Sequence, residues 1–271
     1  MPTIPQLLLA ALLALTCAGI GVLAGRVVPL FHPYPPDDPE NPDAGPPPPP
    51  PPSCPECRAE VAWSRWAPLP ARFVLAGRCP ACAAAVRAPA SVPVLAGVLA
   101  AAVVLTGGDR SPLELAAFCF LAVWAVLLGV VDARVKRLPN LLVFPGYPIA
   151  LVLLGGAALT TPGATDSLVD GLIGLVGLSV FYFVLWFIYP AGMGWGDVKM
   201  AGLLGLYLGW ETLGAPVSGT FLAFLASAVI GLGLIAVGKA TRKSAIPFGP
   251  FMLIGAFILI LAGDPSPLVF G

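Results

Sequence analysis

Long apolar runs separated by short polar turns recur along the chain, and they are the main structural signal in the sequence. A helix that crosses a bilayer needs about 20 mostly apolar residues. Eight segments approach this requirement: Ile4–Val28, Val92–Thr106, Pro112–Val131, Leu141–Leu159, Leu168–Tyr189, Val198–Leu213, Val217–Val237 and Pro247–Ala262. The second and sixth are short, and we expect them to be tilted or partly buried. The pattern predicts an all-α polytopic membrane protein with about eight transmembrane helices.

Composition supports a membrane protein and argues against several other classes. Of the 271 residues, 58% are hydrophobic and only 10% are charged, with a mean hydropathy of +0.92. A soluble domain has roughly a quarter of its residues charged, so a soluble enzyme, a secreted domain and a polar disordered protein are disfavoured. The net charge is zero, so no basic excess indicates a nucleic-acid partner.

Glycine is frequent inside the apolar segments, where small residues let helices approach closely in lipid. In the fifth segment, Gly171, Gly174 and Gly177 recur every three residues and share one helical face. This spacing predicts close packing of that helix against a neighbour rather than a ligand site.

Basic residues predict the orientation of the segments in the membrane. With eight spans, the loops that follow spans 1, 3, 5 and 7 lie on one side. That side holds these basic residues: Arg26, Arg58, Arg65, Arg72, Arg78, Arg87, Arg134, Lys136, Arg137, Lys199, Lys239, Arg242 and Lys243. The other side holds Arg110 alone. Because cytoplasmic loops are enriched in Lys and Arg, this side is predicted to be cytoplasmic and both termini to lie outside.

The chain divides into four parts on these criteria. Residues 1–28 form the first transmembrane helix, and residues 92–271 form a seven-helix membrane domain. Residues 29–52 are proline-rich and end in the run Pro46–Pro52, which favours stiff polyproline II and predicts a spacer. A ligand for a proline-binding module is the alternative. Residues 53–91 form a small cytoplasmic domain with four cysteines.

The four cysteines occur as two CxxC pairs, Cys54 with Cys57 and Cys79 with Cys82. Four thiolates in two short turns can surround one tetrahedral zinc ion, and the spacing is close to that of four-cysteine zinc ribbons. A redox dithiol, an unmetallated set and another soft metal are the alternatives. We expect structural Zn²⁺, because the four protein ligands would leave no open coordination position and a short loop needs a metal to fold.

Two acids stand out at the predicted cytoplasmic ends of spans. Asp132 ends the third span, and Asp197 follows Gly196 at the start of the sixth, where it is a candidate helix N-cap. Each could simply terminate or cap its helix, but ionisable groups at membrane depth are costly and usually functional. Two carboxylates close together can share a proton and act as base and acid on a water and a peptide carbonyl. The glycines before Asp197 would let a peptide backbone approach closely.

Four short motifs, taken in order, resemble those of the type IV prepilin peptidases, a family of GxGD membrane aspartic peptidases. They are the paired CxxC loop after the first span, Asp132 shortly before Leu138-Pro139-Asn140, Gly194-Trp195-Gly196-Asp197-Val198-Lys199, and Ile246-Pro247-Phe248-Gly249-Pro250-Phe251 before the last span. GxGD alone is a weak signal, whereas the four motifs in this order are specific. The resemblance covers nearly the whole chain except the proline-rich insert.

This resemblance implies an endopeptidase of the bacterial inner membrane. It would cleave the short basic leader of type IV prepilins or pilin-like secretion subunits after a glycine, at the cytoplasmic face of the bilayer. It assigns Asp132 and Asp197 as the catalytic pair and Cys54, Cys57, Cys79 and Cys82 as zinc ligands. Gly194, Gly196 and Lys199 would support the substrate and the site.

The resemblance also brings a second activity, N-methylation of the new terminus with S-adenosylmethionine as methyl donor. The family's Arg-Tyr-Pro-x-x-Glu reads Arg87-Ala88-Pro89-Ala90-Ser91-Val92 here, without the tyrosine or the acid. Two other function classes remain as alternatives to the peptidase. One is a zinc-bearing membrane scaffold or transporter, and the other is a membrane thiol oxidoreductase that uses the CxxC pairs.

Overall fold

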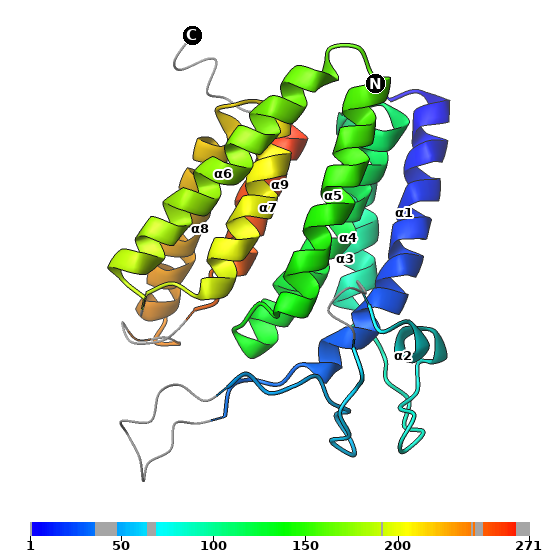
Figure 1. Cartoon of the computed structure of the whole chain (residues 1–271), viewed down its shortest axis with the longest axis vertical. Coiled ribbons are helices and arrows are strands. Elements are labelled where there is room, and N and C mark those ends of the chain that lie inside the picture. The colour runs from blue at the N-terminus through cyan, green and yellow to red at the C-terminus, as the bar shows by residue number, and fades with distance from the viewer. Residues whose placement is uncertain are drawn as a thin grey trace.

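Helices make up the regular structure of the chain, apart from two isolated β-bridges in the part that the structure describes (Figure 1). They are α1 (Ile4–Ala24), η1 (Gly25–Leu30), α2 (Ala71–Ala76), α3 (Ser91–Thr106), α4 (Pro112–Val135), α5 (Asn140–Thr160), α6 (Ala164–Ile188), α7 (Trp195–Glu211), α8 (Ala215–Ala236) and α9 (Gly249–Ala262). The prediction of an all-α chain is confirmed. Each predicted apolar segment corresponds to one helix, and the short α2 lies within the four-cysteine segment.

The computed structural model describes residues 2–35, 48–63, 69–190, 192–239, 241 and 246–263. Parts of several predictions lie outside the described residues. These are residues 36–47 of the proline-rich spacer, residues 64–68 of the four-cysteine segment, the loop at 242–245 and the C-terminal residues from 264 onward.

Five helical segments are long and apolar enough to cross a membrane. They are Ile4–Leu30, Pro112–Val135, Asn140–Thr160, Ala164–Ile188 and Ala215–Ala236. The helices α3 and α9 are apolar but shorter, and α7 has 17 residues. Length and composition therefore give five candidate membrane spans among the described residues, and the three shorter helices need another explanation.

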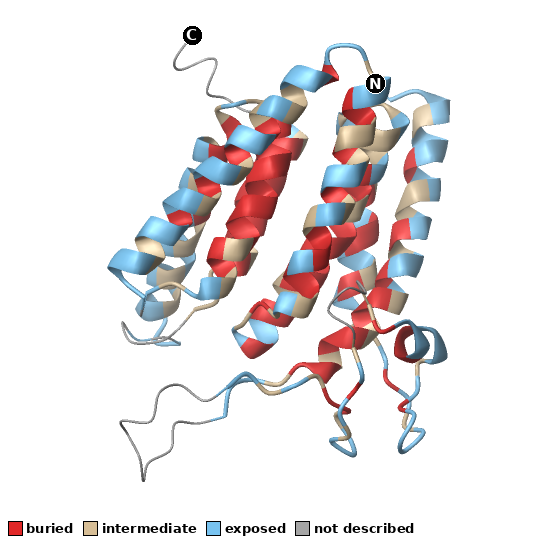
Figure 2. Cartoon of the chain, viewed as in Figure 1, coloured by how far each residue is buried: buried red, intermediate tan, exposed pale blue. Residues whose placement is uncertain are grey.

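The helix α7 is short because it is enclosed by other helices. All of its residues from Met200 to Trp210 are buried, and Figure 2 shows it as an almost continuously buried rod. A helix covered by neighbours need not present a full apolar length to lipid. This confirms the expectation that the sixth segment is partly buried.

Glycines make the contact between α6 and α7 close. A Cβ added at Gly174 would lie 2.3 Å from the carbonyl oxygen of Gly205, and one at Gly171 would lie 2.8 Å from that of Leu206. Gly177, by contrast, has no atom within 4 Å of its added Cβ. The predicted role in packing is thus confirmed for two of the three glycines, and the third lies off the contact.

The helix α4 carries Asp132 in its last turn. Its N-terminus has a capping box in which Ser111 and Glu114 each bond the other's backbone N–H. The helix continues to Val135 and ends at Lys136, whose φ of 51° is left-handed. The predicted end at Val131 was therefore too early, because the break comes from this turn and from the proline that follows it at 139.

Polar contacts join α4 to α7 at the end of the bundle that is opposite to Asp132. Arg110, just before α4, forms a salt bridge of 2.6 Å with Glu211, and the indole N–H of Trp210 donates to Glu114 at 2.9 Å. The hydroxyl of Tyr207 donates to the carbonyl of Ala117 at 3.1 Å. Since the other ends of these two helices carry Asp132 and Asp197, the contacts fix the spacing of the helices that bear both acids.

Candidate active site

A large cavity lies at the end of the bundle where α4 ends and α7 begins. Its volume is about 1200 Å³, and it lies at the same end of the bundle as the loops of the four-cysteine segment (Figure 1). Its lining comes from separate stretches of the chain: Phe31 and Tyr34, then residues 49–52, 136–141, 189–190, 192–197 and 246–248, together with Asp132 and Lys199. This volume exceeds the roughly 300–1,000 Å³ typical of a small-molecule site, so the cavity has room for a length of peptide.

Asp132 enters the cavity from the last turn of α4. Its side chain is 4% exposed, and its Oδ2 accepts a hydrogen bond of 3.1 Å from the backbone N–H of Gly249, the first residue of α9. A Cβ added at Gly249 would lie 2.6 Å from this oxygen. The glycine of the Ile246-Pro247-Phe248-Gly249 motif therefore allows a helix N-terminus to reach the carboxylate, where its N–H favours negative charge.

Asp197 enters the cavity from the first turn of α7 and is 7% exposed. Its Oδ2 accepts a hydrogen bond of 3.2 Å from the backbone N–H of Gly194. The prediction that Asp197 is the N-cap was wrong, since Gly194 holds that position and Asp197 lies three residues later. Its side chain nevertheless serves the helix end, because it reaches back to the N-cap backbone as the acid of a capping box does.

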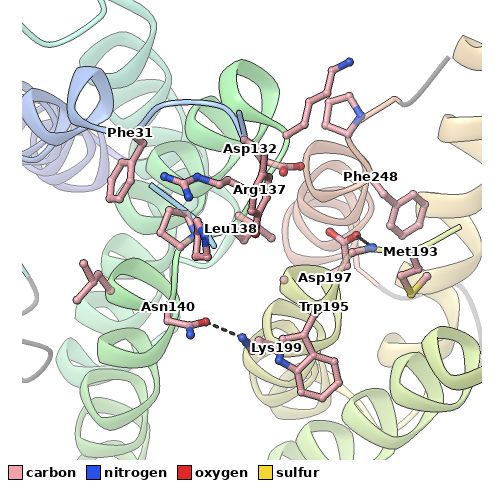
Figure 3. A pocket seen from close by; sticks show the side chains of 18 of the residues that line it. Phe31, Asp132, Arg137, Leu138, Asn140, Met193, Trp195, Asp197, Lys199 and Phe248 are labelled. Atoms are coloured by element: carbon pink, nitrogen blue, oxygen red, sulfur yellow. Dashed lines mark hydrogen bonds between the residues drawn. The ribbon is translucent and has the colours of Figure 1, made fainter. Parts of the chain in front are cut away.

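The two carboxyl groups lie near each other in the cavity although they come from different helices (Figure 3). They are close enough to interact electrostatically, and within the described chain they are the only buried acids. Neither forms an ion pair with a described residue. Two buried carboxylates without a counter-charge cannot readily both ionise, so such a pair can hold one proton between them.

The turn before α5 packs directly on the turn before α7. A Cβ added at Gly196 would lie 2.7 Å from the Cβ of Leu138 and 3.3 Å from its backbone nitrogen. Leu138-Pro139-Asn140 and the glycine-rich turn thus form one contact beside both acids. Any side chain at Gly196 would push these two turns apart.

Lys199 links the two turns a second time. Its ammonium group donates to Asn140 Oδ1 at 2.6 Å and lies 5.4 Å from the ring of Trp195 (Figure 3). The hydroxyl of Tyr147 donates to the backbone carbonyl oxygen of Lys199. Lys199 thereby bridges α5 and α7 at the wall of the cavity.

The structure brings Asp132, Asp197, Gly194, Gly196 and Lys199 together at one cavity. Several contributors to this site were not assigned a role from the sequence. Among them are Gly249 and Asn140, which hydrogen-bond site residues, and the segment of prolines that lines one side. Gly249 and Asn140 both belong to motifs noted in the sequence, and this membership was the signal that could have marked them as site residues.

The four motif cysteines form a second, separate centre. Their sulfur atoms all lie within 4.8 Å of one another, with Cys54 and Cys82 at 3.9 Å and Cys57 and Cys79 at 3.8 Å. Four sulfurs placed tetrahedrally about 2.3 Å from a zinc ion would be about 3.8 Å apart. The cluster can therefore hold a metal ion, and none of its cysteines lines the cavity.

Each CxxC pair sits in a turn of the same form. The residues after the pairs, Arg58 and Ala83, both have a φ of 60°, and each turn is closed by a β-bridge, Ser53 with Glu60 and Arg78 with Ala85. Two equivalent turns thus direct two thiols each toward one point, as a zinc ribbon requires.

The pKa values of two of the thiols indicate that a bound cation would favour the ionised form of the cluster. Backbone N–H groups of Cys82 and then Ala81 lower the pKa of Cys79 to about 7. The backbone N–H of Ala84 lowers the pKa of Cys82, but the adjacent thiol of Cys57 and burial outweigh it and raise the pKa to about 12. Without a metal the cluster cannot ionise fully, whereas a bound divalent cation would compensate the four thiolate charges.

The family model of the "Type IV leader peptidase family" matches residues 119–236. Curated relatives extend the similarity over most of the chain. A protein of Burkholderia pseudomallei (strain 1026b) is 30% identical over 252 residues, covering 79% of this chain and 78% of the relative. The chain belongs to the type IV leader peptidase family.

Other members of the family show similar identity. A relative from Aeromonas hydrophila is 34% identical over 207 residues, which cover 73% of this chain and 66% of the relative, just under two thirds of its length. One from Stutzerimonas stutzeri is 31% identical over 214 residues, covering 75% of this chain and 68% of the relative. All three are named prepilin leader peptidase/N-methyltransferase. No solved structure is significantly similar to the chain.

The stretch that matches the leader peptidase family model contains both cavity acids. Residues 119–236 run from within α4 to the end of α8, and so include Asp132 and Asp197 but not the four-cysteine segment. The family assignment and the buried pair of acids therefore concern the same part of the molecule.

Proposed function

We propose that this family member is an aspartic endopeptidase that removes the leader peptide from type IV prepilins or pilin-like secretion subunits. Cleavage would take place at the cytoplasmic face of the bacterial inner membrane. The observation that carries the proposal is the placement of Asp132 and Asp197, which are buried together in one peptide-sized cavity. The relatives' printed names supply the substrate class.

The chemistry follows from a pair that holds one proton. The ionised carboxylate takes a proton from a water molecule, and the water oxygen attacks the scissile carbonyl carbon. The protonated partner donates to the carbonyl oxygen, which stabilises the tetrahedral intermediate. Its collapse breaks the C–N bond, and the leaving amine takes up a proton from the pair. Gly249 and Gly194 hold the two carboxyl groups in place through their backbone N–H groups.

The decisive experiment is cleavage of a purified prepilin by the purified protein in detergent. The expected result is release of the leader, measured as the loss of mass that corresponds to cleavage after the glycine that precedes the mature sequence. No cleavage would favour a zinc-bearing scaffold or transporter. Zinc that is retained after reduction, with the four thiols protected from alkylating reagents, would count against a thiol oxidoreductase.

A second activity belongs to the relatives by name, since they are called N-methyltransferases as well. The segment Arg87–Val92 of this chain lacks the tyrosine and the acid of the family motif. We include methylation in the proposal as a separate activity that would use S-adenosylmethionine. Adding this methyl donor to the cleavage assay and weighing the product for one added methyl group measures it directly.

The tight contact at Gly196 yields a prediction about cleavage. Gly196→Ala should lower kcat/KM by about tenfold or more, because sub-ångström displacement of a catalytic group is costly. The added methyl would strike Leu138 and shift the turn that carries Asp197. Cleavage kinetics measure the effect, and Gly177→Ala, where the added Cβ meets nothing within 4 Å, is the matched control. Wild-type kinetics for Gly196→Ala would contradict the importance of this contact.

We further propose that all eight apolar helices, α1 and α3–α9, cross the membrane, with the four-cysteine segment and the cavity facing the cytoplasm. Both termini would then lie outside. The consecutive helices alternate in direction, and the N-terminal end of α1 lies at the opposite end of the bundle from the cysteine loop (Figure 1). Within this scheme, residues 1–28, 29–52, 53–91 and 92–271 serve as first helix, spacer, zinc domain and peptidase domain.

Reporter fusions test this orientation. Fusions near residues 60, 136, 195 and 242 should report the cytoplasm, and those near 109, 165 and 265 the outside, because basic loops are retained in the cytoplasm. The expected pattern alternates at every span. A cytoplasmic signal near residue 165 would contradict the eight-span arrangement.

A further inference from the structure

The proline-rich insert reaches the active-site cavity instead of only spacing two domains. Pro49, Pro50, Pro51 and Pro52 all line the cavity that contains the two acids. Pro52 accepts a hydrogen bond of 2.9 Å from the backbone N–H of Val61, which anchors this end of the run to the first cysteine turn. One side of the cavity is therefore built from a part of the chain that the catalytic motifs do not include.

Arg137 holds this segment against the cavity. Its Nη2 donates to the carbonyl oxygen of Pro50 at 2.9 Å, and its guanidinium lies 5.5 Å from the centre of the Tyr34 ring. Arg137 lies in the turn after α4, five residues beyond Asp132, and itself lines the cavity (Figure 3). The segment is thus tied to the same turn that follows the first catalytic acid.

We propose that Pro49–Pro52, which we call the proline wall, is a rigid surface that binds the substrate's leader, with Arg137 as the residue that positions it. This inference rests on the proposed peptidase function. Consecutive prolines favour an extended polyproline II backbone, so little conformational entropy is lost when a ligand binds. Prolines have no N–H, so their carbonyl groups offer only acceptors.

The chemistry of the proline wall fits a basic, extended leader. Backbone N–H groups and ammonium or guanidinium groups of a leader are donors that proline carbonyl oxygens can accept, and the rings of Phe31 and Tyr34 line the same cavity as the wall. The wall comes from the loop between η1 and the cysteine turns, beyond the ends of the membrane helices. It therefore meets the part of a substrate that lies outside the bilayer, which is the leader.

Steady-state cleavage of two substrates tests this role. One is a full-length prepilin and the other is the same protein with its leader cut to the last few residues. The combined change Pro49→Ser, Pro50→Ser and Pro51→Ser should raise KM for the full leader about fivefold, the loss expected for one positioning contact, and leave kcat nearly unchanged. For the shortened leader, the KM of the variant should equal the KM of the wild-type protein for that same substrate.

Two single variants separate the wall's position from its composition. Arg137→Gln should raise KM for the full leader as the triple change does. Arg137→Lys keeps a cationic donor, so its KM should lie between those of Arg137→Gln and the wild type. Pro48→Ser is the matched control, since Pro48 is exposed and does not line the cavity. Zinc content of each variant, measured alongside, shows whether the cysteine turns remain folded.

Several outcomes would overturn the inference. An increase in kcat/KM on loosening the segment would mean that it covers the cavity. Equal losses for both leader lengths, or a fall in kcat alone, would mean that it only supports the fold. Unchanged kinetics in every variant would refute the role of the proline wall and leave the peptidase proposal intact. No cleavage by the wild-type protein would overturn both.

Discussion

Replacing either Asp132 or Asp197 with asparagine should abolish leader cleavage, with a loss of at least about a thousandfold in kcat. Each change removes one half of an acid–base pair that shares a proton. An asparagine has nearly the same shape, and its side-chain oxygen can still accept the hydrogen bond from Gly249 or Gly194. The protein should therefore insert and fold normally, and the loss should appear in kcat.

The measurement is single-turnover cleavage of a prepilin in detergent by each purified variant. Asp166→Asn is the matched control, because Asp166 is an exposed acid in the first turn of α6, away from the cavity. It should cleave like the wild type. Nearly normal cleavage by Asp132→Asn or Asp197→Asn would rule out the aspartic mechanism.

We expect the protein to carry about one zinc ion per chain, and replacing Cys79 with serine should remove it. Three thiolates would remain, and metal binding is coupled to folding of a small metal-bound domain. We expect the segment between about residues 53 and 90 to become sensitive to protease when this coupling is lost. Cleavage should fall through weaker substrate docking or lower stability but retain some turnover, because the proposed catalytic acids Asp132 and Asp197 lie in the cavity, apart from the cysteine cluster.

Zinc content and cleavage kinetics, measured on the same preparation, separate structure from chemistry. Cys119→Ala is the control, since Cys119 is a buried cysteine of α4 outside the four-cysteine cluster, and it should keep its zinc. Full zinc occupancy in Cys79→Ser would exclude a four-cysteine site. Zinc loss together with complete loss of chemistry, in a folded protein that still binds substrate, would contradict a purely structural metal.

The proposed proline wall would give the insert a role beyond spacing. A spacer needs only length and stiffness, whereas Pro50 accepts a hydrogen bond from Arg137 at the cavity itself. The stiffness predicted from the sequence is the same property that would let the segment serve as a binding surface. Cavity wall and spacer are thus compatible roles of a single polyproline stretch.

The sequence by itself determined the helices and the class of chemistry. Hydropathy is a local property, so apolar runs such as Pro112–Val131 predicted each long helix to within a few residues. The motifs around Asp132 and Asp197, and the two CxxC pairs, predicted which acids meet in the cavity and which cysteines cluster, because their spacing is short and specific. The glycine stripe in α6 predicted its close packing, which depends on the absence of side chains.

Only the tertiary structure decided how these parts meet. The N–H that holds Asp132 comes from Gly249, 117 residues away, and the carbonyl bound by Arg137 comes from Pro50, 87 residues away. The true helix ends depend on turn geometry and on neighbouring elements: α7 begins two residues before Asp197, and α4 ends three residues after Asp132. Such contacts arise from the packing of distant segments, and no local pattern encodes which backbone group will reach a given carboxylate.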